Sequence, residues 1–159
     1  MITNIKIYNR FRMDLMARGL AEPPSNRWYL ISIYGSFYPY NIEFLTQKRR
    51  LTLRSKYFME KGLSLCFDDM TPNDIDKFRP ELILFNKGHA KEIIDFAEEI
   101  HKDPNPAMLA IHCHAGISRS GAVGVFISNR FNIHFEDPYI RPNEWVLRVL
   151  ETGKDDIKK

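Results

Sequence analysis

Short apolar runs alternate along the chain with stretches of helical periodicity. The apolar runs are rich in β-branched and aromatic residues, which predicts buried strands. They occupy residues 5–8, 28–34, 62–67 and 108–111. In the other stretches apolar residues recur every three or four positions, which predicts amphipathic helices. These stretches are residues 11–20, 87–101, 120–130 and 143–150.

Strands that alternate with helices predict an α/β fold in three layers. We expect a central, mostly parallel sheet of about four to five strands, flanked by helices. In such sheets the ligand site lies beyond the carboxyl ends of the strands. Asp68 and Asp69 follow one predicted strand directly, and Cys113 follows another. The pattern therefore predicts that these side chains belong to one site.

Composition and length are those of a single globular domain. The chain has 159 residues, of which 44% are hydrophobic, enough to bury a core. We expect one domain over residues 1–159, with residues 152–159 as a frayed, charged tail. The net charge of +3 is too small to argue for nucleic acid. No apolar run has the length of a signal peptide core or a membrane span, so we expect a cytoplasmic monomer without membrane contact.

Residues 111–121, IHCHAGISRSG, concentrate residue types that carry chemistry. Three interpretations are open: a set of metal ligands, a packed turn from strand to helix, or a nucleophile built to meet a negative group. A second pair of ligands at zinc spacing is missing, because His89, His101 and His134 are scattered. The sequence therefore predicts neither a metal nor another cofactor.

A turn from a buried strand into a helix is well suited to bind an anion. Its backbone N–H groups converge, and the helix N-terminus adds partial positive charge. Gly116 allows a close approach of the backbone to a ligand, and the planar fork of Arg119 matches two oxygens of a phosphate. The same field favours the thiolate of Cys113, which becomes a nucleophile. His112 is then expected to hold the loop, and Ser120 to stabilise the thiolate as it leaves.

The pattern His112-Cys113-x-x-Gly116-x-x-Arg119-Ser120 resembles the signature of the cysteine-dependent protein tyrosine phosphatases, in a form similar to their dual-specificity branch. Three further stretches resemble the small bacterial and phage-type members. They are LSLCFDDM, HAKEIIDFAEEI and RPNEWVLRVL. The resemblance extends over residues 28–150 and implies the fold of that family, with a phosphate-binding loop between the last strand and its helix.

The resemblance also implies a mechanism for hydrolysing phosphotyrosine and, in a shallow pocket, phosphoserine or phosphothreonine. Cys113 would attack phosphorus and form a cysteinyl-phosphate. Arg119 and the loop amides would bind the phosphate oxygens. The loop residues concerned are His114, Ala115, Gly116, Ile117, Ser118 and Arg119. A phosphorylated protein or peptide is the expected partner.

A general acid must protonate the leaving oxygen, and Asp69 is our prediction for it. Asp68 is the rival, and Asp74 and Asp76 are more distant candidates. The sequence departs from the family here, because it has no Trp-Pro-Asp and the gap of 113 − 69 = 44 residues is longer than in small dual-specificity enzymes.

Other interpretations remain open. RNA 5′-triphosphatases share a related cysteine loop, and the basic residues 48–56 suit either a solvated face or a patch for phosphorylated partners. A phosphopeptide-binding module without turnover and a sulfurtransferase are further alternatives. Arg130 and Arg141 receive no assignment. Cys66 is predicted to pack in the core between Leu65 and Phe67, with a regulatory disulfide to Cys113 as the alternative.

Overall fold

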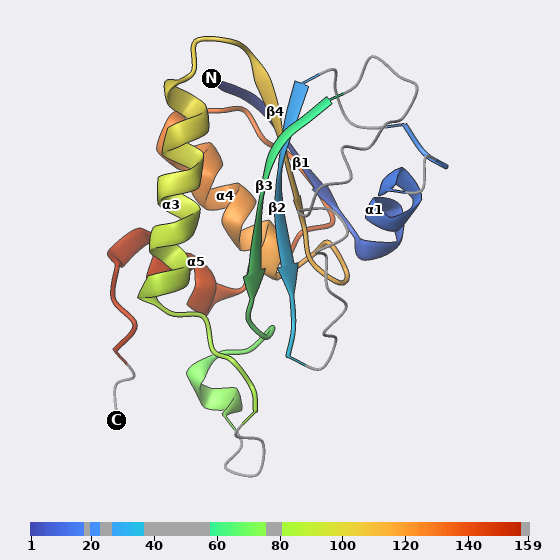
Figure 1. Cartoon of the computed structure of the whole chain (residues 1–159). Helices are drawn as coiled ribbons and strands as arrows, with labels where there is room; N and C mark the ends of the chain where they lie inside the picture. The colour runs from blue at the N-terminus through green and yellow to red at the C-terminus, as the bar shows by residue number, and fades with distance from the viewer. Residues whose placement is uncertain (18–19, 23–26, 37–57, 76–80, 157–159) are drawn as a thin grey trace.

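A computed structural model describes residues 1–17, 20–22, 27–36, 58–75 and 81–156 of the protein (Figure 1). The basic segment at residues 48–56 and the candidate acid Asp76 lie outside these ranges.

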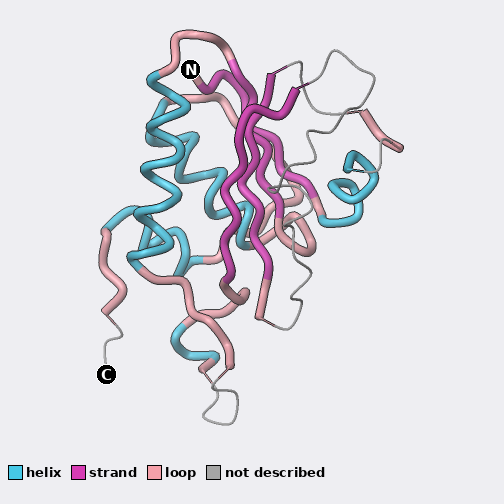
Figure 2. Tube along the Cα trace, viewed as in Figure 1, coloured by secondary structure: helices cyan, strands magenta, loops and turns pink. Residues whose placement is uncertain are grey.

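Four parallel strands form the central sheet. They are β1 (Ile2–Tyr8), β2 (Arg27–Tyr34), β3 (Phe58–Cys66) and β4 (Ala107–His112). The strand order is β1-β4-β2-β3, and every neighbouring pair is parallel. With helices on both faces (Figure 2), this confirms the predicted α/β fold and its parallel sheet.

The two edge strands begin earlier than the apolar pattern predicts. β1 begins at Ile2 rather than Ile5, and β3 begins at Phe58 rather than Gly62. The added strand residues include exposed polar side chains, among them Thr3 and Lys61. An edge strand can expose such side chains while its backbone still pairs, so hydrophobicity alone cannot locate its start.

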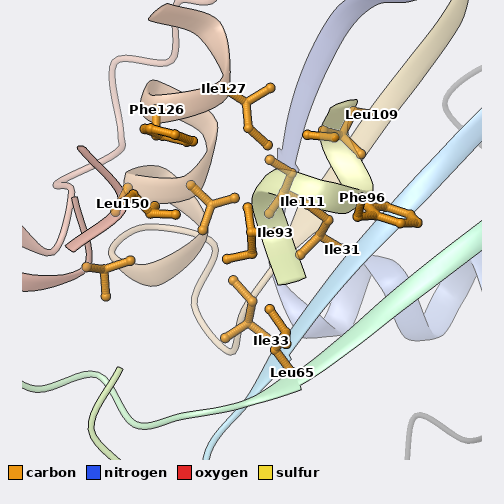
Figure 3. Packing of buried hydrophobic residues seen from close by; sticks show 14 of the residues in the cluster. Ile31, Ile33, Leu65, Ile93, Phe96, Leu109, Ile111, Phe126, Ile127 and Leu150 are labelled. Atoms are coloured by element: carbon orange, nitrogen blue, oxygen red, sulfur yellow. The ribbon is translucent and has the colours of Figure 1, made fainter. Parts of the chain in front are cut away.

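Helices cover the two faces of the sheet unequally. Helix α1 (Arg10–Ala17) lies on one face, whereas α3 (Lys87–Lys102), α4 (Arg119–Phe131) and α5 (Glu144–Thr152) lie on the other (Figure 1). A short 3-10 helix, η1 (Pro72–Asp74), follows β3. The face beneath the three helices holds the larger apolar cluster (Figure 3), which includes Ile31, Ile93, Leu109, Ile127 and Leu150.

Strand β4 lies between β1 and β2, and all its residues are buried. Leu109 and Ile111 belong to the large cluster, while Met108 and Ala110 pack with Met13 of α1 on the opposite face. Alternate side chains of a strand point to opposite faces, so both packed layers fix the orientation of β4. Cys113, the next residue, continues toward the large cluster.

Asparagine residues cap the first turns of two helices. The Asn86 side chain accepts hydrogen bonds from the amides of Gly88 (2.8 Å) and His89 (3.2 Å), as its position predicts. Asn143 caps α5, which continues to Thr152, two residues beyond its predicted end at Leu150.

The segment that follows α5 was predicted to be frayed, yet part of it contacts the body of the domain. The Asp155 carboxylate accepts a hydrogen bond from the Lys87 amide at 3.1 Å, at the start of α3. Among the described residues, no helix is both long and apolar enough to cross a membrane.

Candidate active site

The candidate site is the loop between β4 and α4. Gly116 has a φ of +71°, and a Cβ there would lie 2.7 Å from backbone atoms of Tyr8 and Asn9. The Arg10 amide also donates to the His114 carbonyl at 3.0 Å. The loop therefore packs directly against the junction of β1 and α1, and only glycine fits both the conformation and the space.

Cys113 lies at the base of this loop with 2% of its surface exposed. Its Sγ is 3.2 Å from the Ser120 Oγ. Burial by itself raises the pKa of this thiol. The side chain and amide of Ser120, the amide of Ile117 and the charge of Arg119 nevertheless hold the pKa of Cys113 below its ordinary value. The arrangement favours a thiolate, as a nucleophile requires.

Arg119 begins α4 and is 7% exposed. Its Nη1 donates to the Phe67 carbonyl at 2.8 Å, just beyond the end of β3. Its Nε is buried without a hydrogen-bond partner among the described residues. A buried charged donor without a partner is costly, and an oxyanion bound in the loop is a ligand that satisfies it.

Asp69 lies against the loop. Its Oδ1 accepts hydrogen bonds from the Ser118 hydroxyl at 2.7 Å and from the Asn143 amide group at 2.9 Å. The Asn143 backbone also donates to the Ser118 carbonyl at 3.2 Å. The carboxylate of Asp69 is thus held at the edge of the loop that carries Cys113.

Asn143 is a site residue that sequence reasoning did not identify. Its Oδ1 caps α5 by accepting from the Val146 amide at 3.0 Å, while its Nδ2 reaches Asp69. A helix N-cap can be recognised from sequence. Nothing local, however, shows that this cap contacts a carboxylate 74 residues away.

The Asp68 carboxylate has different hydrogen-bond partners from that of Asp69. Its carboxylate accepts from the Ser36 amide (3.0 Å), the Ser36 hydroxyl (2.8 Å) and the Ile83 amide (2.8 Å). Asp74, the third candidate acid, accepts from the amide and hydroxyl of Thr71, both at 2.7 Å. Of the three, Asp69 is the one whose carboxylate is hydrogen-bonded to the loop.

The two histidines that flank Cys113 occupy different environments. His112 is 2% exposed, and its Nδ1 lies 3.4 Å from the Cys113 carbonyl oxygen. Burial lowers the pKa of His112 to about 4, so this side chain is neutral at neutral pH. His114 is exposed. Within the described ranges, no group of three His, Cys, Asp or Glu residues is arranged to hold a metal ion.

Cys66 ends β3 and is only partly buried. Leu65 and Phe67 on either side of it enter the large core cluster, so Cys66 faces the other side of the sheet. Its predicted packing in the core between these residues is therefore wrong. Cys113 packs on the Leu65 side, and both thiols are free. Burial, together with the charge of Asp68, raises the pKa of Cys66, which makes it the less reactive thiol.

Comparison with protein-family models, with curated proteins and with solved structures finds no match to the chain. What the site does is therefore inferred from its geometry and chemistry.

The contact between Cys113 and Ser120 leads to a first prediction. Because Ser120 lowers the pKa of the thiol, Ser120→Ala is expected to raise it. The rate of alkylation by iodoacetate, measured against pH in a Cys66→Ser background, should then rise at higher pH than in the parent.

Ser118→Ala is the matched control, since that hydroxyl binds Asp69 rather than the sulfur. Its alkylation profile should coincide with the parent's. Equal profiles for both serine variants would contradict the assigned role of Ser120.

Proposed function

We propose that the chain is a phosphatase that hydrolyses phosphotyrosine in proteins or peptides, with phosphoserine and phosphothreonine as further candidate substrates. The observation that carries the proposal is the pairing of Cys113 with Arg119. A thiol whose pKa is lowered lies at the base of a loop that also presents a buried guanidinium Nε without a protein partner among the described residues. A nucleophile and a hydrogen-bond donor for an anion thus lie in the same site.

The first chemical step forms a bond from the Cys113 sulfur to phosphorus while the bond from phosphorus to the ester oxygen breaks. Arg119 and the loop amides bind the oxygens of the phosphoryl group. Asp69, in its protonated form, gives its proton to the leaving oxygen. Both hydrogen bonds to Asp69 reach Oδ1, so we assign the proton transfer to Oδ2.

The second step returns the enzyme to its starting state. The Asp69 carboxylate takes a proton from a water molecule, whose oxygen attacks phosphorus. The bond between sulfur and phosphorus breaks, and inorganic phosphate leaves. The Ser120 hydroxyl, 3.2 Å from the sulfur, donates to the thiolate as it forms. Asp69 keeps the proton for the next cycle.

Hydrolysis by an Asp69→Asn variant tests the proposal. Loss of the general acid is expected to lower kcat for phosphotyrosine by about 10²- to 10⁴-fold. The loss should be smaller for 4-nitrophenyl phosphate, whose leaving group needs less protonation.

Asp74→Asn is the matched control, because that carboxylate follows Asp69 closely in the chain but is hydrogen-bonded to Thr71 rather than to the loop. It should retain the parent's kcat with both substrates. If Asp69→Asn is equally harmless with both substrates, the assignment of the acid is wrong. If the parent protein binds a phosphopeptide without releasing phosphate, the chain is a binding module.

A further inference from the structure

Asp68 is the carboxylate beside the site that the proposed chemistry does not use. It accepts three hydrogen bonds through its side chain, from the amide and hydroxyl of Ser36 and the amide of Ile83. Its own amide donates to the Ile83 carbonyl at 2.7 Å. One residue thus ties the end of β3 to the segment after β2 and to the segment before α3.

The peptide next to Asp68 carries the docking point of Arg119. The Phe67 carbonyl accepts from the Arg119 Nη1 at 2.8 Å, and the Phe67 amide donates to the Tyr34 carbonyl at 3.0 Å. The Phe67 ring is fully buried and packs against Phe85 at a centroid distance of 4.7 Å. The orientation of this carbonyl is therefore fixed from the Tyr34 side by β2 and from the other side by Asp68.

Gly35 shows how closely these groups approach one another. A Cβ at this position would lie 2.7 Å from the Asp68 Oδ1 and 3.5 Å from the Arg119 Nη1. The backbone at residue 35 thus runs against both the carboxylate and the guanidinium. Since the hydrogen-bonded Asp68 carboxylate cannot move away without losing donors, a side chain here would disturb the position of Arg119.

We propose that Asp68 is a positioning residue that holds the Phe67 carbonyl and thereby aims the Arg119 guanidinium at the bound oxyanion. It transfers no proton. With Nη1 bound to the Phe67 carbonyl, Nε and Nη2 are the nitrogens left for a ligand, and Nε is buried. The position of Nη1 therefore sets the direction in which Nε points. A planar fork binds two oxygens only when its orientation is held. The inference rests on the proposed oxyanion site, and it adds a residue that determines its affinity.

Tungstate affinity, measured by calorimetry in a Cys113→Ser background, tests the role of Asp68 without any turnover. Asp68→Asn is expected to weaken tungstate binding by about ten- to a hundredfold, the size of a lost hydrogen bond to a charged group. In the otherwise unchanged protein, the same substitution should raise KM for an aryl phosphate more than it lowers kcat. It should also keep the parent's ratio of kcat between phosphotyrosine and 4-nitrophenyl phosphate, because Asp69 remains the acid.

Asp74→Asn is again the matched control, because it changes a similarly hydrogen-bonded carboxylate whose partner among the described residues is Thr71 rather than the segments that hold Arg119. Its tungstate affinity should stay within about twofold of the parent's. Gly35→Ala is the second variant, in case Asp68→Asn fails to fold. It removes no charge and no hydrogen-bonding group, yet it should weaken tungstate binding by crowding Asp68 and Arg119.

A lower melting temperature with unchanged tungstate affinity, in Asp68→Asn or Gly35→Ala, overturns the inference and leaves Asp68 a structural residue. A much larger loss of kcat for phosphotyrosine than for 4-nitrophenyl phosphate in Asp68→Asn also overturns it, because Asp68 would then be the acid. If the substitution weakens tungstate binding while the parent hydrolyses no aryl phosphate, the inference holds and the phosphatase proposal fails. Absence of tungstate binding by the parent overturns both.

Discussion

Replacement of Cys113 by serine is expected to abolish aryl phosphate hydrolysis, with a loss on the order of 10⁵-fold or more. The site is built to lower the pKa of a thiol through Ser120, Ile117 and Arg119. A serine hydroxyl titrates far too high for these contacts to ionise it near neutral pH. Serine has the same side-chain connectivity as cysteine and is smaller, so it fits the same space, and the buried loop should keep its conformation and its oxyanion affinity.

The measurement pairs steady-state hydrolysis with acid quenching of the reaction with a ³²P-labelled substrate. The parent protein should retain label as a cysteinyl-phosphate, and Cys113→Ser should not. Cys66→Ser is the control, because that thiol lies on the other face of the sheet and has a raised pKa; it should keep both activity and label. Hydrolysis that survives in Cys113→Ser would place the chemistry elsewhere.

Arg119→Lys is expected to lower kcat/KM by about 10³- to 10⁵-fold, the range found when an arginine that stabilises phosphoryl transfer is lost. Lysine keeps the charge but not the planar fork. The Arg119 Nη1 holds the Phe67 carbonyl at 2.8 Å while Nε remains buried for a ligand. An ammonium group cannot serve both partners in this geometry, so oxyanion affinity should fall with the rate.

Arg130→Lys is the matched control. It lies in the last turn of the same helix, where it pairs with Glu98 near the surface, so its kcat/KM and tungstate affinity should match those of the parent. An Arg119→Lys variant that keeps most of its activity would show that a point charge is sufficient. The oxyanion would then be held by the loop amides.

Much of the fold was predictable because its signals are local. The strand and helix periods, the cap at Asn86 and the positive-φ glycine at residue 116 each depend on a few neighbouring residues. The starts of the edge strands were less so, because exposed polar residues such as Thr3 and Lys61 interrupt the apolar pattern there. The position of Cys66 was misjudged, since apolar neighbours on a strand point to the opposite face from the residue between them.

The sequence could favour one of the two adjacent aspartates as the acid, but it could not decide between them. Asp68 and Asp69 are the same chemical group one position apart, so nothing local distinguishes them. Their partners do: Ser118 and Asn143 for Asp69, Ser36 and Ile83 for Asp68. All four partners are distant in sequence.

The sequence by itself determined the α/β class, the loop from strand to helix and the residue types gathered in it. Those properties arise from periodicity and from backbone conformation over a few residues, which a single chain displays directly. Only the tertiary structure decided which carboxylate reaches the loop, which one fastens the docking point of Arg119, and that Asn143 joins the site. These relations depend on side chains brought together from separate strands and helices, and such contacts leave no local pattern in the sequence.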